Sequence, residues 1–248
     1  VFLSSIFLLS LMSFLDDLKS LDPKFRLISQ TIIVYFSLTL INLEYYELPL
    51  KLIIFIYLIF WIYTINITNF IDGSDGYLSV NAISFFLGLL IINKFLPDIF
   101  FSKHLAIIML PILFSFIYFN KPKAKLYMGD TGSILIGYVV GFCLLEIISS
   151  DYWPLAIALY SYPFIDCSLT LVKKIFLGRN IFKRDFDYFF LKPIKKKQTN
   201  NYFVLSVTII YNILNLFIIY SVLYYEIIYL VIISIILSLI KIKIFESK

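Results

Sequence analysis

One continuous apolar run, residues 49–65 (PLKLIIFIYLIFWIYTI), decides the fold of this chain. Lys51 is its one charged residue, and apolar and polar side chains do not alternate along it. Such a run predicts a membrane-spanning helix, since a span needs about 20 residues and some are shorter. Over the 248 residues, 61% are hydrophobic and 15% are charged, against about a quarter charged in soluble domains. Continuous runs favour helices over a closed barrel. The sequence therefore predicts an all-α polytopic membrane helix bundle.

Nine apolar segments bounded by polar clusters are expected to be helices. They are residues 1–15, 27–43, 49–65, 77–93, 104–119, 133–149, 153–172, 202–222 and 226–240. We expect a single transmembrane domain, residues 1–248, with cytoplasmic loops near 16–26, 66–76, 120–132 and 173–200. The chain opens at Val1 inside an apolar run, which predicts that it is truncated at the N-terminus and that earlier helices are missing.

Basic residues predict the orientation of these helices, because Lys and Arg accumulate on the cytoplasmic side of membrane proteins. If the segment after the first helix is cytoplasmic and every helix crosses, all 21 Lys and Arg residues except Lys51, Lys94 and Lys103 lie inside. The most basic segment is 173–200, a composition typical of contact with anionic lipid headgroups.

Residue usage excludes several classes of chemistry. His104, the only histidine, falls at the outer end of a predicted helix, far from the polar motifs. Nucleophile systems built on Ser, His and Asp or on Cys and His are therefore excluded. Cys143 and Cys167 lie in apolar runs, so a disulfide framework or thiolate metal site is not expected.

The first polar motif is Asp16-Asp17, at the end of the first helix. Adjacent carboxylates repel each other, and at a helix C-terminus they also oppose the helix dipole. A bound cation would offset both the repulsion and the unfavourable dipole interaction. The alternative interpretation is an acidic helix end that is solvated by water.

The second motif is residues 66–76, NITNFIDGSDG. Asn66, Asn69, Asp72 and Asp75 follow at intervals of three, which on a helix makes one drifting polar stripe. Carboxylates near membrane depth are costly, and oxygen ligands of this kind suit Mg²⁺ or Mn²⁺. The alternative is a polar loop that breaks the helix.

Two further motifs lie later in the chain. In residues 125–133, KLYMGDTGS, Asp130 is the expected N-cap of the next helix, and backbone N–H groups there favour a phosphate. In the loop 179–193, Lys183 and Arg184 could hold a diphosphate, with Asp185 and Asp187 orienting them or contacting a metal. A lipid-surface role for that loop stays equally open.

Together, three acidic or Gly-rich motifs and a basic loop fall on one side of the membrane. Carboxylates with Mg²⁺ and basic residues suit a diphosphate substrate, and the membrane setting implies a lipid as one substrate. The blocks 14–30, 66–76 and 124–133 resemble, in order and content, the polyprenyl-phosphate N-acetylhexosamine-1-phosphate transferases. This family, glycosyltransferase family 4, includes phospho-N-acetylmuramoyl-pentapeptide transferase and undecaprenyl-phosphate GlcNAc-1-phosphate transferases. The resemblance covers about residues 10–195.

The resemblance implies transfer of a sugar-1-phosphate from a UDP-sugar to polyprenyl phosphate, giving polyprenyl-diphospho-sugar and UMP at the start of a cell-envelope glycan. It implies Mg²⁺ dependence and a multi-pass protein of the bacterial inner membrane whose active site faces the cytoplasm. The expected partners are the UDP-sugar, the polyprenyl phosphate and membrane lipids, without nucleic acid; a homodimer stays open.

By the same resemblance, each motif residue receives an expected role. The catalytic residues are Asp16, Asp17, Asp72, Asp75 and Asp130, and the metal ligands are Asp72, Asp75 and Asp17. The substrate-binding residues are Asn66, Asn69, Lys125, Gly129, Lys183, Arg184 and Asp185. One departure concerns Tyr188, Phe190 and Leu191, which stand where the family carries histidines.

Three alternatives remain beside this interpretation. A CDP-alcohol phosphatidyltransferase is also a membrane enzyme with clustered Asp, but Asp75-Gly76 is not followed by the Ala-Arg of its motif. A transporter with carboxylates on a broken helix would show midplane carboxylates and a paired repeat, and neither is found here. A non-catalytic relative is the third, kept open by the missing histidines.

Overall fold

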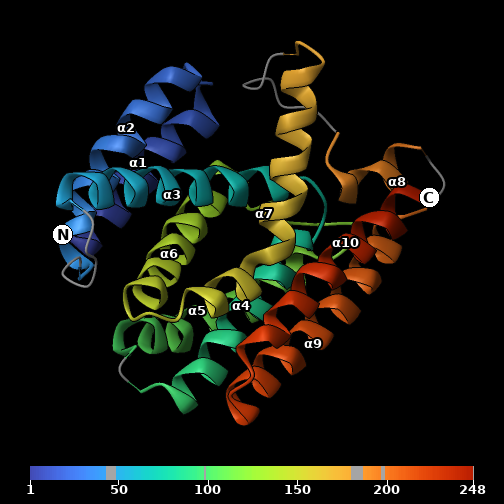
Figure 1. Ribbon diagram of the computed structural model, residues 1–248. Coiled ribbons are helices and arrows are strands. Elements are labelled where there is room, and N and C mark those ends of the chain that lie inside the picture. Colours follow the sequence, from blue (N-terminus) through green and yellow to red (C-terminus); the bar gives the residue numbers. More distant parts are fainter. Residues whose placement is uncertain (43–48, 98, 180–186, 197–198, 248) are drawn as a thin grey trace. The chain divides into compact units, whose positions relative to one another are not determined.

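The computed structural model describes residues 1–42, 49–97, 99–179, 187–196 and 199–247 (Figure 1), in which all regular structure is helical. Seven helices in these ranges are long and apolar enough to cross a membrane, which confirms the predicted all-α polytopic bundle. They are α3 (Leu50–Ile71), α4 (Tyr77–Phe95), α5 (Phe100–Asn120), α6 (Gly129–Ser149), α7 (Trp153–Phe176), α9 (Asn201–Tyr225) and α10 (Val231–Ser247) with the preceding η3 (Ile228–Leu230). The shorter elements are α1 (Phe2–Leu18), α2 (Pro23–Ser37), η1 (Leu38–Leu40), η2 (Phe189–Leu191) and α8 (Lys192–Lys195).

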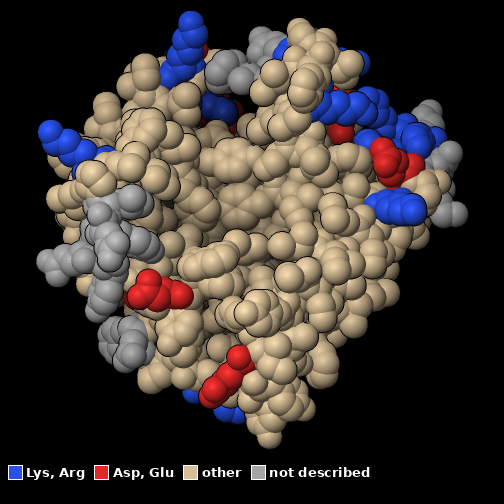
Figure 2. Space-filling model, viewed as in Figure 1, with Lys and Arg blue, Asp and Glu red and all other residues tan. Residues whose placement is uncertain are grey.

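Large apolar side chains lie on the outside of several helices. Phe55 on α3 is 58% exposed and Phe217 on α9 is 68% exposed. On the face shown in Figure 2, uncharged residues cover most of the surface, and Lys and Arg gather near α8. An apolar exterior of this kind suits lipid as the surrounding solvent, because the hydrocarbon region holds no water to solvate polar groups.

The chain forms two compact units. The first comprises residues 1–69 and 128–156. In it α1 packs against α2 and α6, and α3 approaches α6 closely at two glycines. A Cβ on Gly137 would lie 2.8 Å from the Cα of Ile65, and Gly141 faces the ring of Trp61, whose Nε1 donates to the Tyr138 carbonyl at 2.9 Å. Glycines four residues apart are a common device for close helix contact in membranes.

The second unit comprises residues 70–127 and 157–248. In it α4 packs against α5 and α9, and α9 lies beside α10 (Figure 1). Helix α7 is kinked, with non-helical torsion angles at Tyr160. Pro163 explains the kink, since proline lacks the N–H that would bond to the carbonyl four residues earlier. That residues 1–248 form a single domain stays a prediction.

Several predicted helix boundaries were wrong at the points that matter for the polar motifs. Helix α2 begins at Pro23 instead of residue 27, because Asp22 accepts a hydrogen bond from the Lys24 N–H and caps it at 2.7 Å. Helix α3 continues to Ile71 instead of ending at residue 65, so its two asparagines are helical. Helix α6 begins at Gly129 instead of residue 133.

Candidate active site

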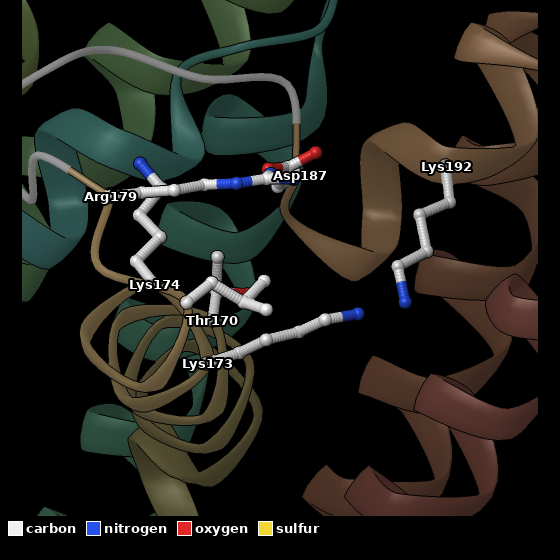
Figure 3. Close-up of a pocket in the computed structure, with 7 residues that line it drawn as sticks. Thr170, Lys173, Lys174, Arg179, Asp187 and Lys192 are labelled. Carbon is white, nitrogen blue, oxygen red and sulfur yellow. The ribbon is translucent and has the colours of Figure 1, made fainter.

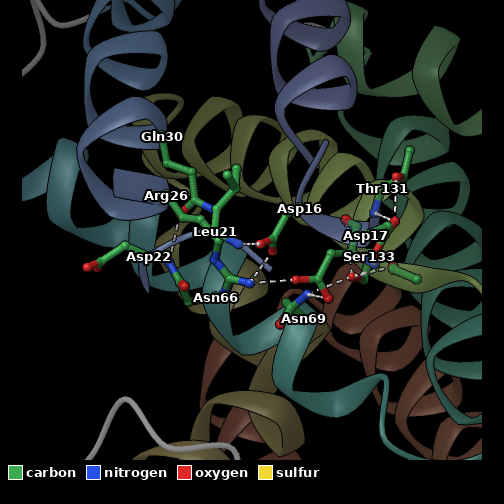
Figure 4. Close-up of polar contacts among 12 residues, drawn as sticks. Asp16, Asp17, Leu21, Asp22, Arg26, Gln30, Asn66, Asn69, Thr131 and Ser133 are labelled. Atoms are coloured by element: carbon green, nitrogen blue, oxygen red, sulfur yellow. Dashed lines mark hydrogen bonds and ion pairs between the residues drawn. The ribbon is translucent and has the colours of Figure 1, made fainter. Parts of the chain in front are cut away.

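A single guanidinium joins two carboxylates in the first unit. Arg26 Nη1 lies 2.5 Å from Asp16 Oδ2 and 2.6 Å from Asp130 Oδ2. Helices α1, α2 and α6 each supply one of the three residues, and Figure 4 shows Asp16 and Arg26 converging. The Asp16 side chain is 6% exposed and the Asp130 side chain 15%, so the two negative charges are held largely out of water by a cation supplied by the chain.

The environment of Asp16 favours its ionised form. Burial raises the pKa of this carboxyl, but the Leu21 N–H at 2.7 Å and the Arg26 guanidinium outweigh burial and hold the pKa below its usual value. Hydrogen bonds to the charged form and a nearby opposite charge act in the same direction. Asp16 is therefore a carboxylate at neutral pH, able to accept a hydrogen bond or bind a cation.

Asp17 occupies the N-terminus of α6. Its carboxylate accepts from the backbone N–H groups of Asp130 and Thr131 at 3.0 Å each, and from the Thr131 hydroxyl at 2.6 Å. A negative charge at this end of a helix is favourable because the N–H groups there carry the positive end of the dipole. Gly129 has a φ of +66°, and a Cβ on it would lie 3.0 Å from Asp17 Oδ2; both facts require glycine at this position.

The prediction that Asp130 caps α6 was wrong. The helix begins one residue before Asp130, with Met128 at the N-cap position. Asp130 instead turns its carboxylate toward Arg26 and toward Asn69, whose Nδ2 donates to Asp130 Oδ1 at 2.9 Å. Asp17 takes over the capping from another helix, which leaves Asp130 available to the polar cluster.

The two asparagines of the second motif face this cluster from α3. Asn69 also donates to the Ser133 hydroxyl at 2.9 Å, and Asn66 donates to Gln30 Oε1 at 3.1 Å (Figure 4). A spacing of three residues places both on one side of the helix, as predicted. The helical stripe ends there, because α3 stops at Ile71 and Asp72 lies beyond its end. Gly76, with a φ of +73°, precedes α4.

Asp75 anchors a loop of the second unit. Its Oδ2 accepts from the backbone N–H groups of Lys123 and Ala124 at 3.1 and 3.3 Å. Asn120 adds to the same connection, accepting from the Gly76 N–H at 3.1 Å. The turn after α3 and the segment after α5 are thus joined within this unit.

Asp72 and Lys125, also of the second unit, differ in exposure. Asp72 is half-buried and Lys125 is exposed. Lys183, Arg184 and Asp185 lie outside the described residues. The structure therefore brings together Asp16, Asp17, Asn69, Gly129 and Asp130 in the first unit, with Asn66 on the same face of α3.

Three residues that replace the expected histidines are core residues. Tyr188, Phe190 and Leu191 are at most 6% exposed. The Phe190 ring stacks on Tyr77 with centroids 4.2 Å apart and an interplanar angle of 8°, and a Cβ on Gly73 would meet Leu191 at 3.2 Å. This segment contributes apolar packing where the family pattern would place acid–base groups.

Sequence reasoning assigned no role to Asp166, which holds the same segment in place. Its fully buried carboxylate accepts from the backbone N–H groups of Phe189 and Phe190 at 2.9 and 3.3 Å, and from the Tyr162 hydroxyl at 2.8 Å. Lys241 of α10 is 2% exposed, with Nζ 3.6 Å from the centre of the Tyr162 ring. The position of Asp166 inside a predicted span could have indicated a role, since placing a carboxylate in a span costs free energy and such residues are usually functional.

The donor chemistry of the motifs fits a hard cation. Within the described residues, no three His, Cys, Asp or Glu side chains gather as a ready-made metal site. Mg²⁺ usually takes one or two carboxylates together with substrate phosphates and waters, so a pair such as Asp72 and Asp75 would be enough. Asp17, also expected as a ligand, has both oxygens engaged by α6, although a carboxylate offers further lone pairs.

Comparisons with known proteins agree with the motif pattern. The family model described as Glycosyl transferase family 4 matches residues 1–148. The phospho-N-acetylmuramoyl-pentapeptide-transferase of Chlamydia caviae is 36% identical over 83 residues, which is 32% of this chain and 24% of that protein. The enzyme of the same name from Thermotoga neapolitana is 26% identical over 153 residues, 57% of this chain and 51% of the relative.

A third relative is named for a different sugar donor group. The undecaprenyl-phosphate alpha-N-acetylglucosaminyl 1-phosphate transferase of Thermotoga maritima is 27% identical over 178 residues, 71% of this chain and 55% of the relative. The chain thus spans about a quarter to just over half the length of these three relatives. Since the family model covers more than half of the residues, and includes the whole polar cluster of the first unit, the chain belongs to glycosyl transferase family 4.

Proposed function

We propose that this chain transfers a sugar-1-phosphate, N-acetylhexosamine-1-phosphate by preference, from a UDP-sugar to a polyprenyl phosphate in the bacterial inner membrane. The products are polyprenyl-diphospho-sugar and UMP, and the reaction begins a cell-envelope glycan on the cytoplasmic side. The observation that carries the proposal is the cluster of Asp16, Arg26, Asn69 and Asp130, assembled from four helices inside the region that matches the family.

The proposed chemistry exchanges one phosphoanhydride for another. An oxygen of the lipid phosphate attacks the phosphorus that carries the sugar, and the bond from this phosphorus to the oxygen shared with UMP breaks. No external energy source is required, so the protein has to supply positioning and charge neutralisation. Asp16, kept ionised by the Leu21 N–H and by Arg26, is proposed to position the acceptor phosphate.

The remaining residues are proposed to shape the site. Asp17 fixes the N-terminus of α6 and thereby the position of Asp130, while Asn66 and Asn69 would bind the nucleotide or order the carboxylates. Mg²⁺ remains a proposed cofactor, with Asp72 and Asp75 as ligands; when bound it would neutralise diphosphate charge. Lys125, Gly129, Lys183, Arg184 and Asp185 are proposed to contact the diphosphate or the sugar.

UMP release tests the proposal directly. The purified protein in detergent, given undecaprenyl phosphate, Mg²⁺ and a panel of UDP-N-acetylhexosamines, should release UMP with one donor and only in the presence of lipid and metal. Asp72→Asn and Asp16→Asn should each reduce turnover by about 100-fold or more, a range typical of a lost acid–base or electrostatic group.

A non-catalytic relative is the competing reading, and the burial of Tyr188, Phe190 and Leu191 favours it. It predicts donor or lipid binding without UMP release from any donor. Unchanged turnover in Asp72→Asn would contradict the metal assignment, and unchanged turnover in Asp16→Asn would contradict the role given to the first unit.

A further inference from the structure

A cationic cavity lies at the C-terminal end of α7 in the second unit. Its volume is about 200 Å³. It is lined by Thr170, Lys173, Lys174, Leu177, Arg179, Asp187 and Lys192. Four of these seven side chains are basic and one is acidic, so the lining carries an excess of positive charge.

Neighbouring carboxylates do not cancel this excess. Asp187 lies 2.8 Å from Arg179 and 3.3 Å from Lys195. Burial raises the pKa of Asp187, but Lys195, Arg179 and Lys174 outweigh burial and hold the pKa below its usual value. Glu246 pairs with Lys192 at 3.0 Å. Both carboxylates are already shared with additional lysines, which leaves the cavity attractive to an anion.

The arrangement of two lysines indicates where the anion would bind. Figure 3 shows Lys173 extending from α7 and Lys192 from α8 toward one another. Ammonium groups that approach each other repel, and an anion between them turns the repulsion into two attractions. Thr170 also lines the cavity, but its hydroxyl donates to Asp166 Oδ1 at 3.4 Å, so the two ammonium groups are the donors offered to a phosphate group.

The surface beside the cavity is apolar. Val172, Ile175 and Phe176, on the last turns of α7, are 48%, 63% and 86% exposed, and Leu177, which lines the cavity, is 54% exposed. A ligand with a phosphate head and a hydrocarbon chain fits both surfaces. Basic pockets next to membrane-spanning helices on the cytoplasmic side are suited to such headgroups.

We propose that this cavity binds the phosphate headgroup of a membrane lipid, with the hydrocarbon chain lying along the exposed face of α7. The phosphate chemistry is shared by two sources, an anionic phospholipid and a polyprenyl phosphate. Binding does not depend on turnover, so the proposal can fail or succeed independently of the proposed function.

Lipid binding to the whole chain in neutral detergent, counted by native mass spectrometry, tests the proposal. The probes are phosphatidic acid, undecaprenyl phosphate, phosphatidylcholine and inorganic phosphate. The double variant Lys173→Gln/Lys192→Gln should bind the two anionic lipids about 30-fold more weakly, since each lysine near an anionic headgroup is worth about 1 kcal/mol. The matched control, Lys196→Gln/Lys243→Gln, removes two exposed lysines that do not line the cavity and should bind as the parent does.

A variant expected to increase the affinity for lipid distinguishes a specific effect on binding from misfolding. Asp187→Asn removes the acidic member of the lining and should tighten binding of the same lipids several-fold. Loss of affinity for both anionic lipids in the double variant supports a general phosphate site, and loss for undecaprenyl phosphate alone supports an acceptor site. Equal affinity in parent and double variant would overturn the proposal, as would displacement of the lipid by inorganic phosphate at equal concentration.

Discussion

Arg26 acts at the scale of a single residue as the counter-charge of two helices. Its guanidinium contacts carboxylates from α1 and α6 while α2 carries its backbone. Breaking a buried ion pair from one side is costly because the other charge is left without compensation. Here one substitution would leave Asp16 and Asp130 facing each other with no cation between them.

We expect Arg26→Gln to lower the free energy of unfolding by about 2–3 kcal/mol and to abolish UMP release. Thermal unfolding in detergent and the UMP assay measure the two effects. Lys24→Gln, an exposed cation two residues earlier on the same helix, is the control for stability and should unfold as the parent does. Parent-like stability in Arg26→Gln would show that Arg26 does not hold the cluster.

The carboxyl of Asp16 should appear in the acid dependence of stability. Its pKa in the folded protein lies below the ordinary value of 3.8, so its ionised form stabilises the fold above that pH and the contribution disappears as the pH falls through the folded pKa. Between pH 6 and pH 3, the parent should therefore lose stability more steeply than Asp16→Asn. Identical slopes in the two unfolding-temperature profiles would count against this assignment.

At the scale of elements, Asp17 connects α1 to the N-terminus of α6. The contact satisfies two N–H groups that a helix start otherwise leaves without an intrahelical partner. It also explains why the acidic pair at the end of α1 is tolerated: one carboxylate is paired with Arg26, and the other moves to the favourable end of a second helix dipole.

Asp17→Ala should cost about 1–2 kcal/mol of stability, the usual effect of a lost cap, and should also reduce turnover because Asp130 loses its fixed position. Asp22→Ala is the matched control, since Asp22 caps α2 by the same kind of bond but contacts no residue of the cluster among its described hydrogen bonds. Chemical denaturation measures stability in both variants, and UMP release measures their turnover. Similar losses of stability, with turnover reduced in Asp17→Ala alone, would support the role of Asp17 in positioning Asp130. Equal turnover in the two variants would contradict it.

The sequence predicted the helices and the motif residues better than it predicted which residues those side chains contact. Hydropathy marked each span, because burial in lipid requires long apolar runs. Spacing placed Asn66 and Asn69 on one face. Sequence spacing could not show that Asp17 caps α6 in place of Asp130, since the contact between Asp17 and the Thr131 N–H joins residues 114 positions apart. Nor could local pattern predict that Phe190 stacks on Tyr77, because ring packing depends on the tertiary fold.

At the scale of the whole molecule, the proposed orientation assigns the basic segments to one side of the membrane. Lys103→Cys should react with an impermeant maleimide added outside intact cells, and Lys196→Cys should react only after the membrane is opened. Both positions are exposed, whereas native Cys143 and Cys167 are buried and should contribute little background. Labelling of both variants from outside would reject the orientation that the basic residues predict.

The discontinuous make-up of the first unit has a consequence for biosynthesis. Arg26 and Asp130 are 104 positions apart, and at typical rates of translation α6 leaves the ribosome roughly 5–20 s after α2. During that interval helices α3 to α5 are made. Asp16, at the end of α1, already has Arg26 as its partner, but α6 and its Asp130 are not yet present. The cluster is thus completed late, and a nascent chain arrested before Gly129 would contain Asp16, Arg26 and Asn69 without Asp130, the partner that α6 supplies to Arg26 and Asn69.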